Sequence, residues 1–304
     1  MQYLICGFSV ATDIILPGAW PVQRESTPDI TLRLGVVPHF PGRSGHDGRL
    51  WSVQGDDFLL SIPGLVRFLV RAGREIIVEP APGIGVDETV PFMLSTGFAA
   101  LLHQRSVFAL HAATVVWQGR AIALCGPAGI GKSTMAAALC GAGAQFVGDD
   151  IAAIHPGYDG RPLVYPDGRQ HRLWADAVAH LGMADRQERP VRTRLRKFHV
   201  APSQETESGP VPLSTVVLLE DRPDRAPPAP PAIIDLPLVD ALPLLRGQVY
   251  RPGLAERMGH GGRLFTQSAQ LLFHVRVLLL VRTRTLTDLR AGAKLLLSPI
   301  MEGG

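Results

Sequence analysis

Three features of this 304-residue chain predict an α/β fold. Short apolar runs between turn residues make the first part β-rich. Farther on, apolar strands alternate with segments of helical periodicity. Hydrophobic residues make up 46% of the chain and charged residues 19%, which is enough apolar material for a packed core. We therefore predict a β-rich N-terminal region at 1–90 and an α/β domain at 91–304.

The N-terminal region opens on an apolar stretch that carries Asp13 and has no basic segment before it, so strands are predicted there rather than a signal peptide. A proline- and glycine-rich cluster, Glu79–Gly85, ends the region. The strands predicted between these points are Ile30–Leu34, Leu50–Val53, Phe58–Ile62, Leu65–Val70 and Glu75–Val78.

The middle of the chain begins with apolar residues at helical spacing over Phe92–Gln104. A strand at Val107–Leu110 precedes two strands that flank a turn at residues 118–120, which predicts a hairpin. The hairpin strands and the elements after them are Ala112–Trp117, Ala121–Cys125, a helix from Lys132 to about Cys140, and a short strand Gln145–Val147 that ends just before Asp149 and Asp150.

The last part of the chain is predicted to hold one clear strand, Thr215–Leu219, between two loops rich in proline, glycine and serine. The apolar run Val275–Val281 is broken by Arg276, which favours a buried strand over a membrane span. The predicted loops are Glu205–Pro212 and Arg222–Pro231, and the predicted helices are Leu254–Met258, Leu264–His274 and Leu286–Leu297.

Composition excludes some classes of protein. The three cysteines, Cys6, Cys125 and Cys140, have no CxxC spacing, so neither a zinc site nor a disulfide scaffold is indicated. The histidines include no HExxH helix. This cysteine usage fits a reducing cytoplasm, and we expect a cytoplasmic protein. A net charge of only +3 does not favour nucleic acid or a membrane as a partner.

The strongest motif is a glycine loop that fits G-x(4)-G-K-[ST] in full and lies between an apolar strand and a helix. Its glycines allow backbone N–H groups to surround phosphates, and the helix N-terminus favours the same anions. Lys132 would contact the β- and γ-phosphates, and Ser133 would contact magnesium. The motif predicts binding of a nucleoside triphosphate with Mg²⁺, through Gly126, Ala128, Gly129, Ile130, Gly131, Lys132, Ser133 and Thr134.

Two adjacent carboxylates, Asp149 and Asp150, follow unusually soon, with Asp149 only 17 residues after Lys132. One carboxylate can coordinate Mg²⁺ opposite Ser133, and the other can accept the proton of an attacking hydroxyl. Gly-Asp-Asp is also good turn chemistry, so a solvated turn is the competing interpretation. Their position relative to the loop favours a functional role.

The segments around the loop resemble the catalytic core of HPr serine kinase/phosphorylase. The resemblance covers FALHAATVV at 108–116, GRAIALCG at 119–126, the loop, and GAQFVGDD at 143–150. It continues more weakly over Val164–Ala177 and Leu213–Glu220. It implies the fold that HPr kinase C-terminal domains share with phosphoenolpyruvate carboxykinases, with ATP and Mg²⁺ as cofactors, and so makes 91–304 an HPr-kinase-like catalytic domain.

The resemblance also implies roles for matching positions. Asp149 would be the base that activates a serine hydroxyl, and Asp150 would join Ser133 on magnesium. His111 would lie beside the carboxylates and orient or polarise one of them, although a histidine at the start of a strand is more often structural. The division of roles between Asp149 and Asp150 stays open.

The chain departs from the family in two ways. It has no counterpart of the N-terminal domain of full HPr kinases, and no Glu-Ile-Arg-Gly segment follows the Asp pair. The Tyr-Pro-Asp-Gly turn with Arg172-Leu-Trp after it is more similar to the HPr-kinase-like enzymes of lasso-peptide gene clusters. Those enzymes phosphorylate a serine at or near the C-terminus of a precursor peptide.

A basic run at 186–200 carries Arg196 and Lys197. A kinase needs a positive group to stabilise the transferred phosphoryl, so Lys197, Arg196 and Arg172 are candidates. A solvated basic loop is an equally good interpretation, whereas the lack of interleaved aromatic residues makes a nucleic-acid patch a poor one.

The predicted function is therefore ATP-dependent phosphorylation of a serine hydroxyl on a peptide, in particular the C-terminal region of a lasso precursor. An HPr-type protein acceptor and a nucleotide-binding sensor without transfer activity are the alternatives. We expect a peptide partner, neither nucleic acid nor membrane, and an assembly into homo-oligomers would be in keeping with the family.

Overall fold

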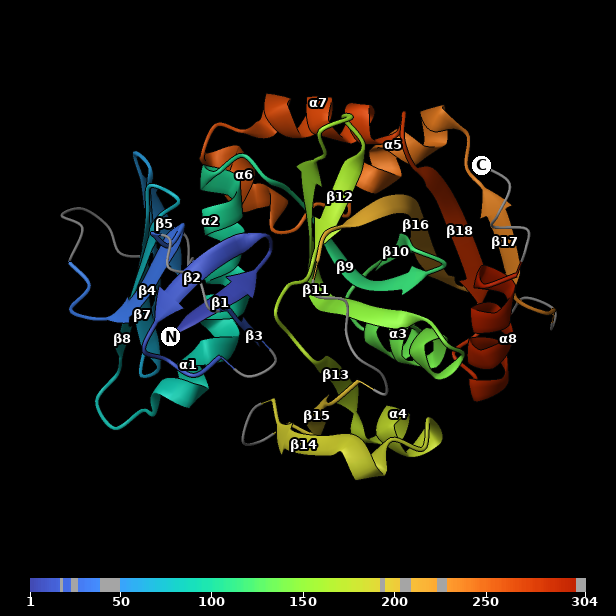
Figure 1. The fold of residues 1–304 in the computed structure, drawn as a ribbon, viewed down its shortest axis with the longest axis horizontal. Helices are drawn as coiled ribbons and strands as arrows, with labels where there is room; N and C mark the ends of the chain where they lie inside the picture. Colours follow the sequence, from blue (N-terminus) through green and yellow to red (C-terminus); the bar gives the residue numbers. More distant parts are fainter. Residues whose placement is uncertain are drawn as a thin grey trace.

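The computed structural model describes residues 1–16, 19–22, 27–38, 50–191, 195–202, 209–222 and 229–298. Within them the chain forms a mixed α/β fold with three sheets. Figure 1 shows the N-terminal strands on one side, the large mixed sheet on the other, and the smallest sheet below the mixed sheet. No helix of the described part is both long and apolar enough to span a lipid bilayer.

The first sheet uses strands that all precede the first helix. They are β1 (Gln2–Ile5), β2 (Phe8–Thr12), β3 (Trp20–Pro21), β4 (Ile30–Leu34), β5 (Trp51–Gln54), β6 (Asp57–Ile62), β7 (Val66–Arg71) and β8 (Glu75–Pro80). Their order in the sheet is β3-β1-β2-β4-β8-β7-β6-β5. The five predicted strands of this region are confirmed to within one or two residues, because period-2 apolar patterns and turn residues mark them locally.

The first helical segment starts earlier than predicted, at Val86 instead of Phe92. It consists of α1 (Val86–Phe92), the π-helical η2 (Met93–Gly97) and α2 (Phe98–Gln104). Pro91 lies inside α1 and has no N–H to donate to the preceding turn. The wider π-helical turn follows directly, as expected where the regular hydrogen-bond ladder is interrupted. Phe98 and Leu102 are fully buried against the first sheet.

The second sheet is mixed and partly closed on itself. Its strands are β9 (Phe108–Trp117), β10 (Arg120–Cys125), β11 (Gln145–Pro156), β12 (Pro162–Tyr165), β16 (Val211–Asp221), β17 (Ala232–Asp235) and β18 (Arg276–Arg282). Their order is β10-β9-β11-β12-β16-β18-β17, and β10 also pairs with β16 in parallel. The predicted β9–β10 hairpin and the buried strand at β18 are confirmed.

Two predicted strand bounds in this sheet are wrong. The separate strands Val107–Leu110 and Ala112–Trp117 are one continuous β9, which passes through His111. The strand predicted to stop at Val147 continues as β11 to Pro156, with a register shift between Phe146 and Gly148. Aspartates are poor strand formers, which suggested an end there. The pairing of Asp149 and Asp150 with β9 instead keeps both within the sheet.

The third sheet has the order β13-β15-β14 and lies below β11 and α3 in Figure 1. Its strands and the neighbouring helical turns are β13 (His171–Trp174), α4 (Ala175–His180), the 3-10 helix η3 (Ala184–Arg186), β14 (Gln187–Pro190) and β15 (Lys197–Val200). The predicted loops Glu205–Pro212 and Arg222–Pro231 lie largely outside the described residues, but the first ends inside β16.

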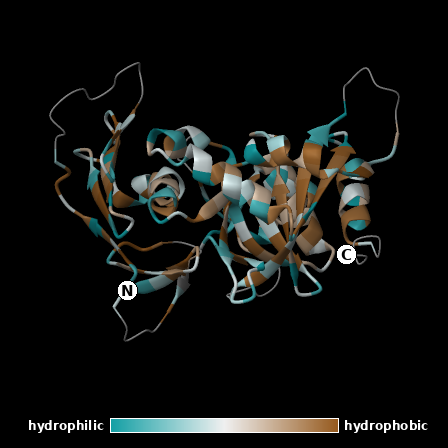
Figure 2. Ribbon diagram, turned by 90° about the horizontal axis from the view of Figure 1, so that it is seen from above, coloured by the Kyte–Doolittle hydropathy of each residue, from teal (hydrophilic) through white to brown (hydrophobic). Residues whose placement is uncertain are grey.

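Helices cover both faces of the second sheet. They are α3 (Lys132–Gly141), α5 (Leu238–Arg246), α6 (Pro252–Arg257), α7 (Gly261–Leu271) and α8 (Leu286–Leu296). Helices α3 and α8 share one core with the sheet, and α5 and α7 share another on its opposite face (Figure 1). The predicted helices α3, α6, α7 and α8 are confirmed with small shifts of their ends. Figure 2 shows the brown, apolar strands that lie between these helices.

A third core joins the N-terminal region to the second sheet. It contains first-sheet residues such as Phe68 and Ile76, helix residues such as Leu101, and Ile151 and Ala153 from β11. The predicted division at residue 90 stays a prediction, and this core crosses it. The contact fixes the N-terminal region next to the strand that carries Asp149 and Asp150.

Candidate functional site

The glycine loop connects the end of β10 to the start of α3. Gly126, Gly129 and Gly131 have φ values of 141°, 81° and 98°, which L-residues rarely adopt. A Cβ at Gly126 would also lie 3.1 Å from the carbonyl oxygen of Leu219. Lys132 Nζ donates to the carbonyl oxygens of Gly126 (2.8 Å) and Pro127 (3.3 Å). Burial lowers the pKa of this ammonium group, so a phosphate anion beside it would offset its lost hydration.

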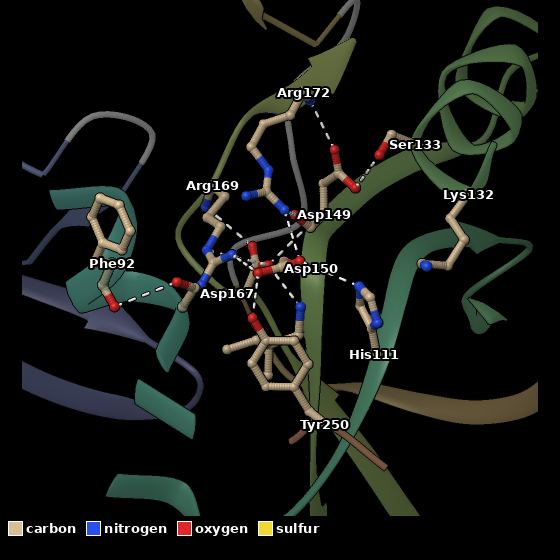
Figure 3. Close-up of polar contacts among 12 residues, drawn as sticks. Phe92, His111, Lys132, Ser133, Asp149, Asp150, Asp167, Arg169, Arg172 and Tyr250 are labelled. Atoms are coloured by element: carbon tan, nitrogen blue, oxygen red, sulfur yellow. Dashed lines mark hydrogen bonds and ion pairs between the residues drawn. The ribbon is translucent and has the colours of Figure 1, made fainter. Parts of the chain in front are cut away.

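The two aspartates of β11 have different hydrogen-bond and ion-pair partners (Figure 3). Asp149 is 2% exposed. Its Oδ1 accepts a hydrogen bond of 2.7 Å from Ser133 Oγ, and its Oδ2 accepts one of 2.8 Å from the backbone N–H of Arg172. The structure therefore pairs Ser133 with Asp149, whereas the resemblance implied that Asp150 would join Ser133 on magnesium, with the division of roles between the two aspartates left open.

Asp150 lies in a cluster of positive and hydrogen-bonding groups (Figure 3). Arg172 Nη2 lies 2.8 Å from Oδ1, Tyr250 OH donates to Oδ2 at 2.7 Å, and Arg169 Nη1 also pairs with Oδ2. His111 Nε2 lies 3.5 Å from Oδ1. Burial alone would raise the pKa of Asp150, but Arg172, Arg169 and the hydrogen bonds from His111 and Tyr250 hold it well below its usual range. Asp150 is thus a fixed carboxylate.

Asp167 accepts backbone hydrogen bonds from β11 next to the register shift at Gly148. Its Oδ2 accepts the backbone N–H groups of Asp149 (3.1 Å) and Ile151 (3.2 Å), and its Oδ1 accepts that of Arg169 (3.1 Å). A Cβ on Gly148 would lie 2.6 Å from Oδ1 of this carboxylate. Gly148 is therefore required for close approach, which explains the glycine of Gly-Asp-Asp without invoking a turn. Burial raises the pKa of Asp167 to about 6.

The glycine loop, both aspartates of β11 and His111 line one cavity of about 390 Å³. The glycine loop and Ser133 form one wall, and Asp149, Asp150 and His111 lie at its base. Lys197 from β15 and Trp174 from β13 contribute from the third sheet, with Lys197 Nζ 5.9 Å from the centre of the Trp174 ring. Burial lowers the pKa of Lys197. The cavity thus holds a buried ammonium group, Lys132, and a half-buried one, Lys197.

The predicted site residues separate into two groups. The loop residues Ala128 to Thr134 line the cavity, as do His111, Asp149, Asp150 and Lys197. Of the basic candidates, Arg172 lines the cavity and pairs with Asp150, whereas Arg196 is exposed and is not among the lining residues. Arg192 and Arg194 of the basic run lie outside the described residues.

Sequence reasoning missed four residues of this site. Asp167 and Arg169 lie in or next to the sequence Tyr-Pro-Asp-Gly, which is typical of a turn and so gave no sign of their role. Tyr250 lies far along the chain. An isolated β-bridge between Leu110 and Val249 brings it close to β9. Arg282, at the end of β18, is 3% exposed and also lines the cavity. Its guanidinium donates to the carbonyl oxygens of Ile130 (2.8 Å) and Thr283 (3.0 Å).

The arrangement fits a magnesium–nucleotide complex chemically. Mg²⁺ prefers oxygen ligands and is usually held by one or two protein oxygens together with phosphates and water. Ser133 and Asp149, which already lie within hydrogen-bond distance, supply such a pair. Among the described residues no group of three or more His, Cys, Asp or Glu side chains is arranged to hold a metal by itself.

Comparisons with known proteins give little. No family model and no curated protein matches the sequence. Among solved structures, the chain is similar to the HPr(Ser) kinase/phosphatase from Coxiella burnetii, with a TM-score of 0.32, 14% identity, and coverage of 64% of this chain and 99% of that one. A likeness at this TM-score supports no argument, so function has to be argued from the chain's own residues.

Proposed function

We propose that this protein is an ATP- and Mg²⁺-dependent kinase that transfers the γ-phosphoryl group to a serine hydroxyl of a peptide. The observation that carries the proposal is the convergence of the glycine loop, Lys132, Ser133, the two aspartates and His111 on one cavity. A site that only bound nucleotide would need the loop and a metal ligand, but not a second carboxylate paired with a histidine.

The reaction makes a bond between the serine Oγ and the γ-phosphorus and breaks the bond from that phosphorus to the β–γ bridging oxygen, so that ADP leaves. The loop N–H groups and Lys132 would neutralise the phosphate oxygens. Lys197 and Arg172 line the same cavity and would stabilise charge that spreads over the transferred group. Bound magnesium would supply further charge stabilisation at the phosphates.

The geometry supports a division of roles that differs from the sequence expectation. Ser133 and Asp149 are in contact and would hold the ion together. Asp150 is a weak base, because its arginine partners lower its pKa, but it is well placed to orient His111. With Nε2–H directed at Asp150, a neutral His111 presents Nδ1 as the acceptor for the serine proton. We therefore assign proton transfer to His111 and magnesium to Ser133 with Asp149.

The acceptor we propose is the C-terminal region of a lasso precursor peptide. Support comes from the resemblance of the Val164–Ala177 segment to kinases of that kind. The same segment supplies Asp167, Arg169 and Arg172 to the site, so it belongs to the catalytic centre of this chain.

Phosphate transfer from radiolabelled Mg-ATP to an array of serine peptides, together with fluorescent-nucleotide binding, tests these roles. We expect Asp149→Asn to lose transfer and to need much more Mg²⁺. His111→Asn should lose roughly a hundredfold or more in rate with its Mg²⁺ requirement unchanged. The matched control is Asp185→Asn, whose exposed carboxylate lies outside the lining of this cavity and which should leave transfer intact.

Two results would contradict the proposal in different ways. If His111→Asn is fully active and Asp149→Asn loses transfer without any change in Mg²⁺ requirement, Asp149 is the base and the sequence expectation was correct. If the protein binds Mg-ATP but phosphorylates no peptide, while all variants also bind it normally, the site belongs to a nucleotide sensor.

A further inference from the structure

A second cavity, of about 580 Å³, lies next to the first and has a different character. We propose that it binds the acceptor peptide by taking an apolar side chain next to the serine. This inference rests on the proposed kinase function and adds to it a substrate class: serine peptides with a large aliphatic or aromatic neighbour. It also gives the N-terminal region a role in the reaction.

The position of the second cavity relative to the catalytic groups is the first reason. Arg172 lines both cavities, so the two spaces share a wall. Arg169 lines the second cavity and pairs with Asp150, which lines the first. One side chain therefore separates the second cavity from the carboxylate that orients His111. A peptide residue bound there would place its neighbour close to the transferred phosphoryl group.

The walls of the second cavity are the second reason. The apolar lining residues are Leu65 from the turn between β6 and β7, Val90 and Phe92 from α1, Leu94 from η2, Pro190 at the end of β14 and Val191 just after it. A cavity of this size falls within the range of roughly 300–1000 Å³ that is typical of small-ligand sites. The apolar part of the wall favours an aliphatic or aromatic side chain. The other lining residues are charged or polar and can contact the polar groups of a peptide: Asp87, Glu88, Arg169, Arg172, Arg189 and His199.

The polar atoms of the lining residues are the third reason. Arg172 Nε and His199 Nδ1 are buried and have no hydrogen-bond partner among the described residues. A buried N–H donor left without an acceptor costs roughly 1–3 kcal/mol. Peptide carbonyl oxygens are suitable acceptors, whereas an aliphatic lipid chain offers none. A peptide has both apolar side chains for the apolar walls and carbonyl oxygens for the unpaired donors, so it fits this cavity better than a ligand with only one of these features.

The rim of the second cavity also suits an extended peptide. β14 is the outer strand of its sheet, and its residues Gln187–Pro190 are exposed. An outer strand can pair with a peptide added beside it. Across the opening, Arg189 of β14 lies 3.7 Å from Asp87 of α1, so the N-terminal region and the third sheet meet at the rim.

The test uses the full chain and synthetic serine peptides that differ only in the residue beside the serine. We expect peptides with Leu or Phe at that position to have a KM at least tenfold lower than those with Asp or Lys. Val191→Trp, which fills the cavity from a half-buried position, should raise the KM for the Leu peptide at least tenfold and leave ATP affinity unchanged. Val239→Trp, at a 78% exposed position on α5, is the matched control and should change neither.

Direct binding separates failure of this inference from failure of the kinase assignment. Anisotropy of fluorescein-labelled Leu and Asp peptides is measured with a non-hydrolysable ATP analogue present. Selective binding of the Leu peptide that Val191→Trp removes supports the cavity even if no transfer is seen. Equal KM and equal binding for Leu and Asp peptides, or no effect of Val191→Trp, would overturn the inference while leaving a kinase that phosphorylates peptides intact. Tight binding of fatty-acid micelles by the wild type and not by Val191→Trp, without peptide binding, would also overturn it.

Discussion

At the residue scale, His171 shows how the site keeps a neutral group beside Asp149. Its side chain is fully buried and its ring centre lies 4.0 Å from that of Phe146. Neither ring nitrogen has a hydrogen-bond partner among the described residues. Burial lowers its pKa to about 4, although the nearby Asp149 acts in the opposite direction. His171 therefore stays neutral at pH 7 and packs as an aromatic ring.

This histidine should make the protein sensitive to acid. In the unfolded chain His171 takes up a proton near pH 6.5, but in the native protein it does so only near pH 4. The unfolded state therefore binds more protons between these values, and the free energy of unfolding falls as the pH falls. Between pH 7 and pH 4, His171 should lower the free energy of unfolding of the wild type by up to about 3 kcal/mol. We expect this decrease to be absent in His171→Phe.

Urea denaturation at several pH values measures this effect. His180→Phe, at an exposed position, is the control. Its free energy of unfolding should fall with pH as much as that of the wild type. An unchanged pH slope in His171→Phe would show that this side chain does not titrate as a buried neutral group.

At the scale of elements, the end of β18 holds the glycine loop. Arg282 reaches from the last position of β18 to the carbonyl oxygen of Ile130, and its Nη2 would lie only 3.0 Å from a Cβ at Gly131. Burial lowers the pKa of this guanidinium, so its charge favours an anion nearby. The strand thus positions the loop and adds a positive charge to its cavity.

We expect Arg282→Gln to weaken ATP binding about tenfold or more, since hydrogen bonds made by charged groups contribute roughly 1.5–3 kcal/mol. Arg276→Gln is a matched control on the same strand. The Arg276 guanidinium lies 2.7 Å from the carboxylate of Asp235, and Arg276 does not line the cavity. Titration with a fluorescent ATP analogue measures both variants. Equal affinities would mean that the loop holds its shape without Arg282.

At the scale of the whole molecule, one apolar core joins the first sheet to the strand that carries Asp149 and Asp150. Phe68 and Ile76 of the first sheet and Tyr250, far along the chain, belong to the same buried cluster. Tyr250 also donates to Asp150, so this core and the site share a residue. Separating the first sheet from the rest would expose a large apolar surface on both parts.

The shared core predicts that the N-terminal region and the rest unfold together. Differential scanning calorimetry should show a single unfolding transition. Its midpoint temperature should equal the temperature at which half of the nucleotide binding is lost. Two resolved transitions, one of them leaving ATP binding intact, would show that the N-terminal region is an independent unit.

Local patterns account for most of the predicted elements. The hairpin β9–β10, the helix after the glycine loop and the strands between β4 and β8 were all predicted, because turn residues and apolar periodicity act over a few residues. The predicted end of β11 at Val147 was wrong. Two adjacent aspartates are typical of a turn, and only the pairing with β9 shows that they lie within a strand. The predicted helix start at Phe92 was also wrong, because the apolar residues at helical spacing begin there, whereas the helix itself starts at Val86 and contains Pro91.

The sequence by itself determined that a glycine loop of the kind predicted to bind phosphates is followed closely by two carboxylates and preceded by a histidine, because these residues are set by a contiguous motif and its flanks. Only the tertiary structure decided that Ser133 contacts Asp149 and that Asp150 contacts Arg169, Arg172 and Tyr250. Both carboxylates line one cavity, but the partners of each come from segments that are distant in the chain. Those segments turn two neighbouring carboxylates into groups of different chemistry.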